Sequence, residues 1–297
     1  MTATTDLDAA YAVCERITTT EAKNFAWGIR LLPAPKRRAL SAVYAFARRI
    51  DDIGDGDLPA ERKLAELATA REQVTAAAPP ADDPVLQALF DAAEHFPIPL
   101  DAFTELVHGC ELDVRGTRYA TYDDTLGYCR DVAGSIGRLS LGVFAPPLTA
   151  ADRELASHRA DTLGLALQIT NILRDVREDL SIGRVYLPQE DLDRFGCTLQ
   201  RLPDGSLDPC GGALAEVVRF LAARAAGLYD EGFRLLPMLD HRSRACCAAM
   251  AGIYRELLRR LSDDPTLMMT GRASLPTATK LRIAGRSLLP ATATVAR

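Results

Sequence analysis

Apolar residues recur with a helical period along most of the chain, and this pattern is the strongest constraint on its fold. Segments rich in Ala, Leu, Arg and Glu place apolar residues three and four positions apart, whereas no segment alternates apolar and polar residues long enough to predict a strand. The pattern predicts an all-α protein. Its helices are expected near residues 6–20, 36–55, 60–77, 84–95, 99–116, 122–144, 150–180, 212–236 and 241–262.

Proline and glycine clusters separate the predicted helices, and none of these clusters resembles an interdomain linker. They lie at residues 79–80, 97–99, 146–147 and 203–212. A chain of 297 residues with 48% hydrophobic residues is long enough to bury one large core. The sequence therefore predicts a single domain over residues 1–297.

Several classes of protein are excluded by composition. The longest apolar run, 245–254, is about half of the roughly 20 residues that span a bilayer, and the N-terminus lacks the order of charges in a signal peptide. A net charge of −5 argues against a general nucleic-acid binder. Seven cysteines without a CxxC pair favour reduced thiols over disulfides or structural zinc. We therefore expect a cytoplasmic, soluble protein that does not bind nucleic acid.

The C-terminal segment, residues 276–297, is a basic tail. It contains Lys280, Arg282, Arg286 and Arg297 and no acidic residue. Two interpretations remain open for this tail. One is peripheral contact with phosphates or an anionic membrane surface, and the other is a frayed, solvated terminus.

A narrow polar stripe crosses the predicted helix at 36–55. At 100° per residue, Tyr44, Arg48, Asp51 and Asp55 lie close to one line along the helix. Most other positions on this helix are apolar, which is typical of a buried helix. The acids are therefore expected to face an interior cleft.

The predicted helix at 150–180 repeats this arrangement. Gln168, Asn171, Asp175 and Asp179 form its polar stripe, and the two acids stand at the same helical spacing as Asp51 and Asp55. Carboxylates one turn apart repel each other, and burial raises the cost of an uncompensated pair. A cation is therefore expected between them.

Mg²⁺ fits such a pair of stripes, because it prefers oxygen ligands and is usually held by one or two carboxylates together with substrate phosphate oxygens. The neighbouring Arg48, Arg174 and Arg184 are placed to neutralise the remaining phosphate charge. The stripes therefore predict binding of a diphosphate through Mg²⁺. The alternative, a solvated charged face, is favoured for one stripe alone but not for two with matching spacing.

Other candidate motifs carry less information. Glu105 and His108 form a single ExxH unit, whereas a di-iron bundle needs two, and the four histidines show no HExxH spacing, so we interpret them as packing or surface residues. Three glycines interrupt a helical pattern at 128–142, and close helix packing explains them more simply than a ligand. Tyr128 in this segment is either a proton donor or acceptor, or a half-buried packing residue.

These stretches resemble the squalene/phytoene synthase family over about residues 10–282. The matching motifs are YAFARRIDDIGD at 44–55, YCRDVAGSIG at 128–137 and LQITNILRDVREDLSIGRVYLP at 167–188. The resemblance implies an isoprenoid-synthase-type helical bundle with a central active-site cavity. It also implies a prenyltransferase that couples two prenyl diphosphates head to head.

The resemblance assigns roles to individual residues. The family's Mg²⁺ ligands match Asp51, Asp55, Asn171, Asp175 and Asp179, and its catalytic tyrosine matches Tyr128. Its diphosphate-contacting positions match Tyr44, Arg48, Gln168, Asn171, Arg184 and Tyr186. The prenyl-chain channel matches Val132, Ala133, Ile136 and Gly137, which makes this segment more than a packing surface. Further substrate-contacting positions match Lys23, Phe25, Tyr254, Arg272 and Lys280.

Within the family, the opening EAKNFAWGIRLLPAPKRRALSAVYAFARRIDDIGDG and the ending GRASLP most resemble bacterial presqualene diphosphate synthases of the hopanoid pathway. This resemblance implies that two farnesyl diphosphates become presqualene diphosphate, with about two to three Mg²⁺ ions and no NADPH. An allylic cation from one farnesyl group is attacked by the double bond of the other, and proton loss at Tyr128 closes a cyclopropane. Separate downstream enzymes complete squalene.

Three alternatives remain. One is a phytoene synthase, which joins two geranylgeranyl diphosphates. Another is a squalene or dehydrosqualene synthase. The third, from a different class, is a non-catalytic assembly or interaction protein with the same fold, against which both intact acidic motifs argue.

Overall fold

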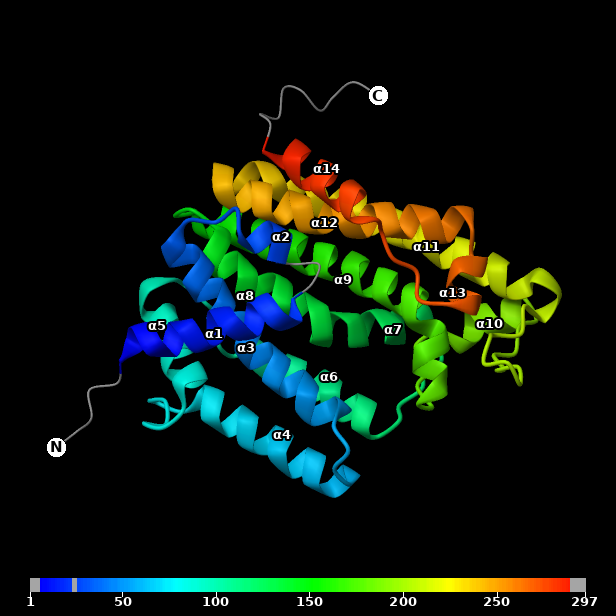
Figure 1. Cartoon of the computed structure of the whole chain (residues 1–297), viewed down its shortest axis with the longest axis horizontal. Helices are drawn as coiled ribbons and strands as arrows, with labels where there is room; N and C mark the ends of the chain where they lie inside the picture. Colours follow the sequence, from blue (N-terminus) through cyan, green and yellow to red (C-terminus); the bar gives the residue numbers. More distant parts are fainter. Residues whose placement is uncertain (1–5, 23–25, 289–297) are drawn as a thin grey trace.

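The computed structural model describes residues 6–22 and 26–288 of the chain. Within these ranges the regular structure is helical, apart from an isolated antiparallel bridge between Arg201 and Leu207 (Figure 1). The prediction of an all-α protein is confirmed. Among the same residues, no helix combines the length and the apolar character needed to cross a membrane.

Every segment predicted to be helical contains a helix. These helices are α1 (Leu7–Glu21), α3 (Ala34–Asp55), α4 (Ala60–Thr75), α5 (Pro84–His95), α6 (Ala102–Val114), α7 (Tyr122–Cys129), α8 (Ser135–Phe144), α9 (Ala150–Ser181), α11 (Ala213–Gly232) and α12 (His241–Asp263). Capping residues explain several of their starts, because Asp6, Asp83, Thr149 and Asp240 each accept a hydrogen bond from a first-turn backbone N–H.

Four further helices were not predicted from the sequence: α2 (Ala26–Ile29), α10 (Gln189–Arg194), α13 (Thr266–Thr270) and α14 (Thr277–Ser287). The first three have at most six residues, too few for a helical period to be recognised. The last lies in the basic tail and packs along α12, with Ile283 beside Gly252. This part of the tail is therefore a docked helix.

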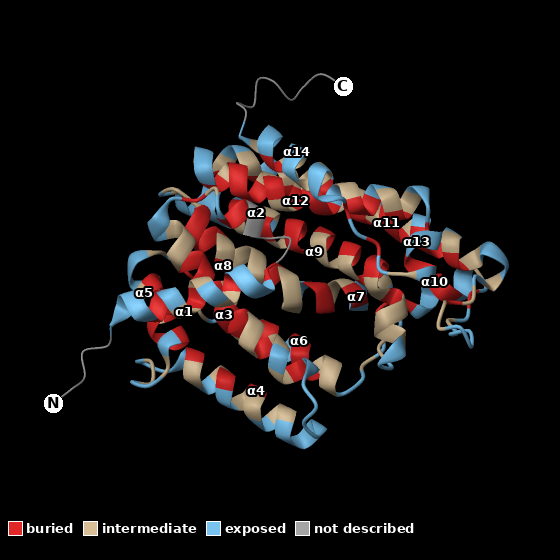
Figure 2. Cartoon of the chain, viewed as in Figure 1, coloured by how far each residue is buried: buried red, intermediate tan, exposed pale blue. Residues whose placement is uncertain are grey.

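The 32-residue helix α9 forms the centre of the fold. It packs against α8 and α7 on one side and against α11, α12 and α13 on the other (Figure 1). Figure 2 shows buried positions along most of its length. The helix α3 contacts α6 and α8, and α8 in turn packs against α9.

A single π-helical turn, Arg130–Gly134, interrupts the predicted helix at 122–144 and joins α7 to α8. The backbone of this region lies very close to α9, because a Cβ on Gly164 would collide with the carbonyl of Ala133. A Cβ on Gly137 would likewise collide with the carbonyl of Ala160. These glycines therefore permit close helix packing, and the π turn is a local irregularity of the kind often found at functional sites.

Candidate active site

The polar stripes on α3 and α9 remain partly accessible although their helices are mostly buried. On α9, Gln168, Asn171 and Asp175 keep some exposure, while the adjacent Ile169 and Ile172 are buried. A small cavity below this stripe is lined by Ile172, Val176, Asp179, Arg184, Val185, Tyr186, Leu187 and Leu199. Asp179 therefore shares a small cavity with Arg184 and Tyr186.

Arg184 connects the two acidic helices. It follows the end of α9, where Gly183 turns the chain at a φ of 80°. Its Nη1 donates to Oδ1 of Asp55 at 2.7 Å, and its Nη2 donates to the carbonyl of Gly54 at 3.4 Å. The two motifs that are more than a hundred residues apart in sequence therefore meet at their C-terminal ends.

Asp51 is the deeply placed acid of the α3 stripe. Burial, and next the charge of Asp55, raise its pKa to about 7. The Sγ of Cys110 on α6 approaches its Oδ1 at 3.8 Å. On the same helix, Arg48 pairs with Asp52 at 2.6 Å. Burial also raises the pKa of Tyr44 to about 12, so this tyrosine is a neutral hydrogen-bonding group.

Asp175 is the acid of the α9 stripe that arginines hold. Arg174 pairs with both of its carboxylate oxygens. Arg272, which follows α13, adds a second pair through Nε at 2.9 Å. Tyr254 of α12 hydrogen-bonds with Arg174, so the sequence-predicted Tyr254 and Arg272 both lie around Asp175.

Asp179 and Asn171, on the same stripe, have side-chain oxygens in unfavourable surroundings. Burial, and next the charge of Asp175, raise the pKa of Asp179 to about 7. Asn171 donates to Oε1 of Gln168 at 3.2 Å, but its own Oδ1 is buried without a hydrogen-bond partner among the described residues. Such atoms are costly unless a partner arrives.

These donors fit Mg²⁺. The predicted ligands are carboxylate and amide oxygens. A divalent cation would stabilise the ionised form of Asp51 and Asp179, whose pKa is raised by burial and by neighbouring acids. Across residues 6–22 and 26–288, no three His, Cys, Asp or Glu side chains converge as a ready-made metal cage. In the usual mode of Mg²⁺ binding, substrate phosphate oxygens complete the coordination.

Asp113, at the end of α6, was missed by the sequence analysis. The hydroxyl of Tyr128 donates to its Oδ2 at 3.0 Å, and the hydroxyl of Tyr186 donates to its Oδ1 at 2.8 Å. The two rings stack at 4.9 Å, and Tyr119 packs against Tyr128 at 5.3 Å. Because its partners stand 15 and 73 positions away in sequence, no local spacing could reveal this carboxylate.

Asp113 also connects the tyrosines electrostatically to both stripes. Burial raises its pKa, and it in turn contributes to the raised pKa of Asp51 and of Asp179. Burial raises the pKa of Tyr128 well above its usual value, so Tyr128 is a neutral phenol. The acids, Arg184 and the tyrosine pair therefore form one electrostatic unit.

The predicted channel residues lie on the π turn and the first turn of α8, directly after Tyr128. Val132, Ala133, Ile136 and Gly137 are all partly exposed, next to buried neighbours on the same turns. The backbone of Gly137 meets α9, so this segment serves close packing and keeps accessible apolar surface at once.

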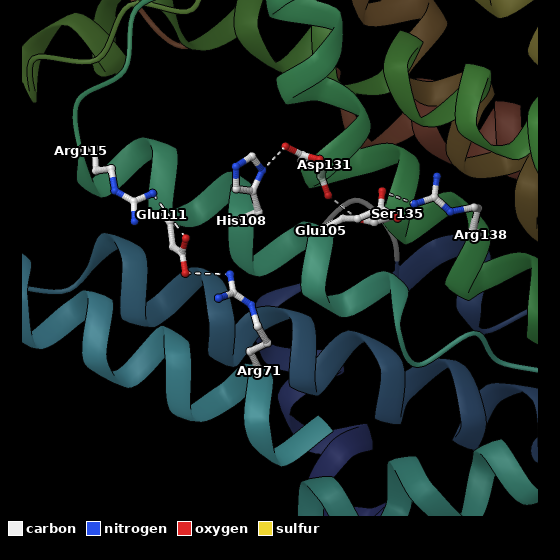
Figure 3. Close-up of polar contacts among 8 residues, drawn as sticks. All are labelled: Arg71, Glu105, His108, Glu111, Arg115, Asp131, Ser135 and Arg138. Carbon is white, nitrogen blue, oxygen red and sulfur yellow. Dashed lines mark hydrogen bonds and ion pairs between the residues drawn. The ribbon is translucent and has the colours of Figure 1, made fainter. Parts of the chain in front are cut away.

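A polar network on α6 supports the π turn from outside (Figure 3). His108 bonds to Asp131 of the turn at 2.7 Å, and Glu105 pairs with Arg138 of α8. Arg138 also pairs with Asp161 of α9. The ExxH unit therefore forms interhelical contacts to the π turn and to α8.

The remaining predicted positions are at the edges of the described structure. Lys23 and Phe25 lie outside the described residues. Lys280 lies in the first half of α14, which packs against α12 and α2. Its predicted contact with substrate stays a prediction.

A family model and individual known proteins match this chain over most of its length. The model of the family described as squalene/phytoene synthase matches residues 18–279. A phytoene synthase of Mycobacterium tuberculosis is 48% identical over 96% of this chain and 92% of its own length. The 15-cis-phytoene synthase of Synechococcus elongatus is 34% identical, covering 93% of this chain and 91% of its own.

Solved structures agree with the fold. A dehydrosqualene synthase in complex with a ligand aligns with a TM-score of 0.82 and 30% identity, covering 95% of this chain and 96% of its own. The squalene synthase HpnC of Alicyclobacillus acidocaldarius aligns with a TM-score of 0.74 and 28% identity, covering 87% and 95%. The isoprenoid-synthase-type helical fold expected from the sequence is therefore confirmed.

Proposed function

Because the chain belongs to the squalene/phytoene synthase family, we propose that it is a prenyltransferase that couples two prenyl diphosphates head to head and releases diphosphate. One observation carries this proposal. A hydrogen-bonded tyrosine and carboxylate, Tyr128 and Asp113, stand within the electrostatic reach of Asp51 and Asp179, one from each acidic stripe. Diphosphate binding and proton transfer can therefore take place in one site.

The acidic stripes and their arginines form the diphosphate-binding part of the site. Asp51, Asp55, Asn171, Asp175 and Asp179 would hold Mg²⁺, which supplies charge neutralisation of the leaving diphosphate when bound. Arg48, Arg184 and Arg272 each pair with a carboxylate in the absence of substrate. They would contact phosphate oxygens when the diphosphate and Mg²⁺ compete for those pairs.

Tyr128 handles the proton lost when the cyclopropane closes. Its hydroxyl proton already points to Oδ2 of Asp113, so a lone pair of Oη remains to accept a proton from the substrate carbon. As that proton arrives, the phenolic proton moves to Asp113, and Tyr128 stays neutral throughout. The raised pKa of Asp113 makes this carboxylate a suitable final acceptor.

The apolar residues of the π turn and α8 protect the allylic cation. Water would quench such a cation, so its binding surface needs to be dry. Val132 and Ile136 keep accessible apolar surface beside Tyr128 and offer this protection. They are also the surface along which a prenyl chain would lie.

For the chain length we propose two farnesyl diphosphates and presqualene diphosphate as the product, made without NADPH. The resemblance of the N-terminal segment to presqualene diphosphate synthases supports this choice, and so do the squalene-type names of the two solved structures. The second candidate is phytoene synthesis from geranylgeranyl diphosphate. The 48% identity with a protein named phytoene synthase favours that candidate.

Product analysis tests the proposal and separates the two candidates. The purified protein is incubated with Mg²⁺ and either farnesyl or geranylgeranyl diphosphate, with and without NADPH. We expect a cyclopropyl diphosphate from farnesyl diphosphate in both conditions. Turnover of geranylgeranyl diphosphate alone selects the second candidate, and no turnover of either substrate overturns the coupling activity.

A doubly substituted protein tests the non-catalytic alternative. Asp51→Asn together with Asp175→Asn removes one acid from each stripe while keeping side-chain size, so activity should disappear. Wild-type activity in this protein would show that neither stripe takes part in the reaction.

A further inference from the structure

The segment between α10 and α11 brings two thiols into contact. The Sγ of Cys197 lies 3.3 Å from the Sγ of Cys210, thirteen positions along the chain. A disulfide has a sulfur–sulfur distance of about 2.05 Å, so the two atoms need to approach by only about 1.2 Å. No CxxC spacing marks this pair in the sequence, which favours reduced thiols over disulfides.

The backbone around the pair holds the two cysteines together. Between them the chain turns back on itself, with Leu202 N–H bonded to the carbonyl of Ser206 and Asp208 N–H bonded to the carbonyl of Gln200, both at 2.9 Å. The chain segments that carry the two sulfurs therefore run side by side in the folded state. Loop closure has already been achieved by folding.

Cys210 has an unusual backbone conformation for its type. Its φ is 49°, in the left-handed region that non-glycine residues rarely adopt, and Asp208 fixes its N–H with a hydrogen bond of 2.7 Å. This conformation directs Sγ back to Cys197 and to the carbonyl of Thr198 at 3.2 Å. Cys210 is partly exposed while Cys197 is buried, so reagents reach Cys210 first.

Cys246 and Cys247 show that proximity in sequence does not create such a pair. They are neighbours on α12 and both are buried, and the Sγ of Cys246 contacts the Sδ of Met250 at 3.6 Å. Successive residues on a helix point in different directions. Cys247 therefore provides a matched control for a buried thiol without a thiol partner.

We propose that Cys197 and Cys210 are a dithiol that low-molecular-mass disulfides convert reversibly to an intramolecular disulfide. The thiolate of Cys210 attacks the small disulfide, forms a mixed disulfide and releases one small thiol. The thiolate of Cys197 then attacks Sγ of Cys210 and releases the second small thiol. The two thiol protons of the protein end on the two released thiols, and excess reduced thiol reverses both steps.

The cross-link acts on the candidate active site through the turn that it closes. Leu207, inside the closed loop, is buried and donates its N–H to the carbonyl of Met269 in α13 at 3.0 Å. Arg272, three residues later, pairs with Asp175. Leu199 of the same loop lines the small cavity beside Asp179. Restraining the loop therefore restrains one side of the diphosphate-binding residues.

Peptide mapping tests the disulfide directly. Cleavage after Arg194, Arg201 and Arg219 places Cys197 and Cys210 on separate peptides, residues 195–201 and 202–219. The folded full chain is treated with oxidised or reduced glutathione, its free thiols are alkylated, and the two digests are compared by mass spectrometry. We expect the two peptides joined after oxidation, separate after reduction, and never joined in Cys197→Ser or Cys210→Ser.

The melting temperature provides a second measurement on the same samples. Closing a loop of this length should raise it by about 3 to 8 °C in the wild type and in Cys247→Ala, and not in Cys210→Ser. Alkylation of both cysteines after oxidation, or glutathione attached without a link between the peptides, overturns the proposal. The peptide map of the wild-type protein decides whether the disulfide forms, even if a serine variant folds poorly.

The effect on catalysis rests on the proposed function and has its own readout. We expect the oxidised wild type to show a KM for the prenyl diphosphate changed roughly threefold, with kcat much less affected. Joined peptides with unchanged KM would overturn the connection through Arg272. If the protein turns over no prenyl diphosphate, the proposed function fails, while the peptide map still decides the thiol pair.

Discussion

The two acidic stripes share one helical spacing, yet they differ in how their acids are partnered. Asp55 on α3 is 59% exposed, and its ion pair within the described residues is with Arg184. Asp175 on α9 is 17% exposed, and Arg174 and Arg272 hold it from two sides. The arginine-bound acid is therefore the outer one on α3 and the enclosed one on α9.

The other acid of each stripe is Asp51 on α3 and Asp179 on α9. Neither Asp51 nor Asp179 forms an ion pair with an arginine within the described residues, and the pKa of each is raised to about 7. Both are influenced by Asp113. Equal spacing therefore does not give equal environments, because arginines neutralise one acid of each stripe and not the other.

The largest effect is expected from removing an unpaired acid. Asp51→Asn or Asp179→Asn should lower kcat/KM about 10³-fold, because each removes charge that only the metal and substrate compensate. Asp55→Asn and Asp175→Asn should cost about 10²-fold, since their arginines become available to phosphate. Steady-state kinetics with Asp57→Asn as an exposed control measures the difference. Equal losses at all four positions would contradict the division between the acids.

The next effect concerns the two tyrosines that share Asp113. Tyr128→Phe should lower kcat about 10²-fold while KM changes little, because only proton transfer is lost. Tyr186→Phe removes the matching bond to the other oxygen of Asp113 and should lower kcat about tenfold. Parallel measurement of both variants checks this. If Tyr128→Phe raised KM as much as it lowered kcat, its role would be binding rather than proton transfer.

Much of this site follows from local patterns in the sequence. The helical period predicted α3 and α9, and helical phase placed Asp51, Asp55, Asp175 and Asp179 on narrow stripes. Both inferences rest on residues within a few turns of one another. They succeed because helix geometry is fixed by short-range hydrogen bonds.

What could not be predicted depends on contacts between distant segments. The role proposed for Asp113 depends on its hydrogen bonds with Tyr128 and Tyr186. The position of the Cys210 thiol depends on a turn and on a positive φ. The π turn after Tyr128 was also invisible, since its residues fit an uninterrupted helical pattern. Tertiary packing decides each of these features.

A smaller effect should separate the arginine partners of the enclosed acid. Arg272→Ala should raise KM about tenfold and leave kcat nearly unchanged, because Asp175 keeps Arg174 while the exposed phosphate contact is lost. Arg282→Ala on α14 is a control with the same loss of charge away from the stripes, and its KM should stay within about twofold of the wild type. Equal KM values for the two variants would remove Arg272 from the binding site.

The smallest effect is on stability, and it isolates the unpaired acids without any substrate. In the unfolded chain an aspartate titrates near pH 3.9, roughly three units below the pKa of Asp51 and Asp179 in the folded protein. Between about pH 4 and pH 7 the folded protein therefore binds more protons than the unfolded chain, and its stability falls as the pH rises. With a chelator present, we expect the melting temperature to drop by about 3 to 6 °C from pH 5 to pH 8.

Mg²⁺ at pH 8 should restore much of this loss, because it binds the ionised acids of the folded state. The double variant Asp51→Asn with Asp179→Asn should show a flatter pH dependence and a weaker response to Mg²⁺, whereas the exposed control Asp57→Asn should behave like the wild type with chelator. Differential scanning fluorimetry over this pH range measures all of them. If the double variant kept the wild-type slope, the pH dependence would come from other groups, and the contrast between neutralised and unpaired acids would lose its energetic basis.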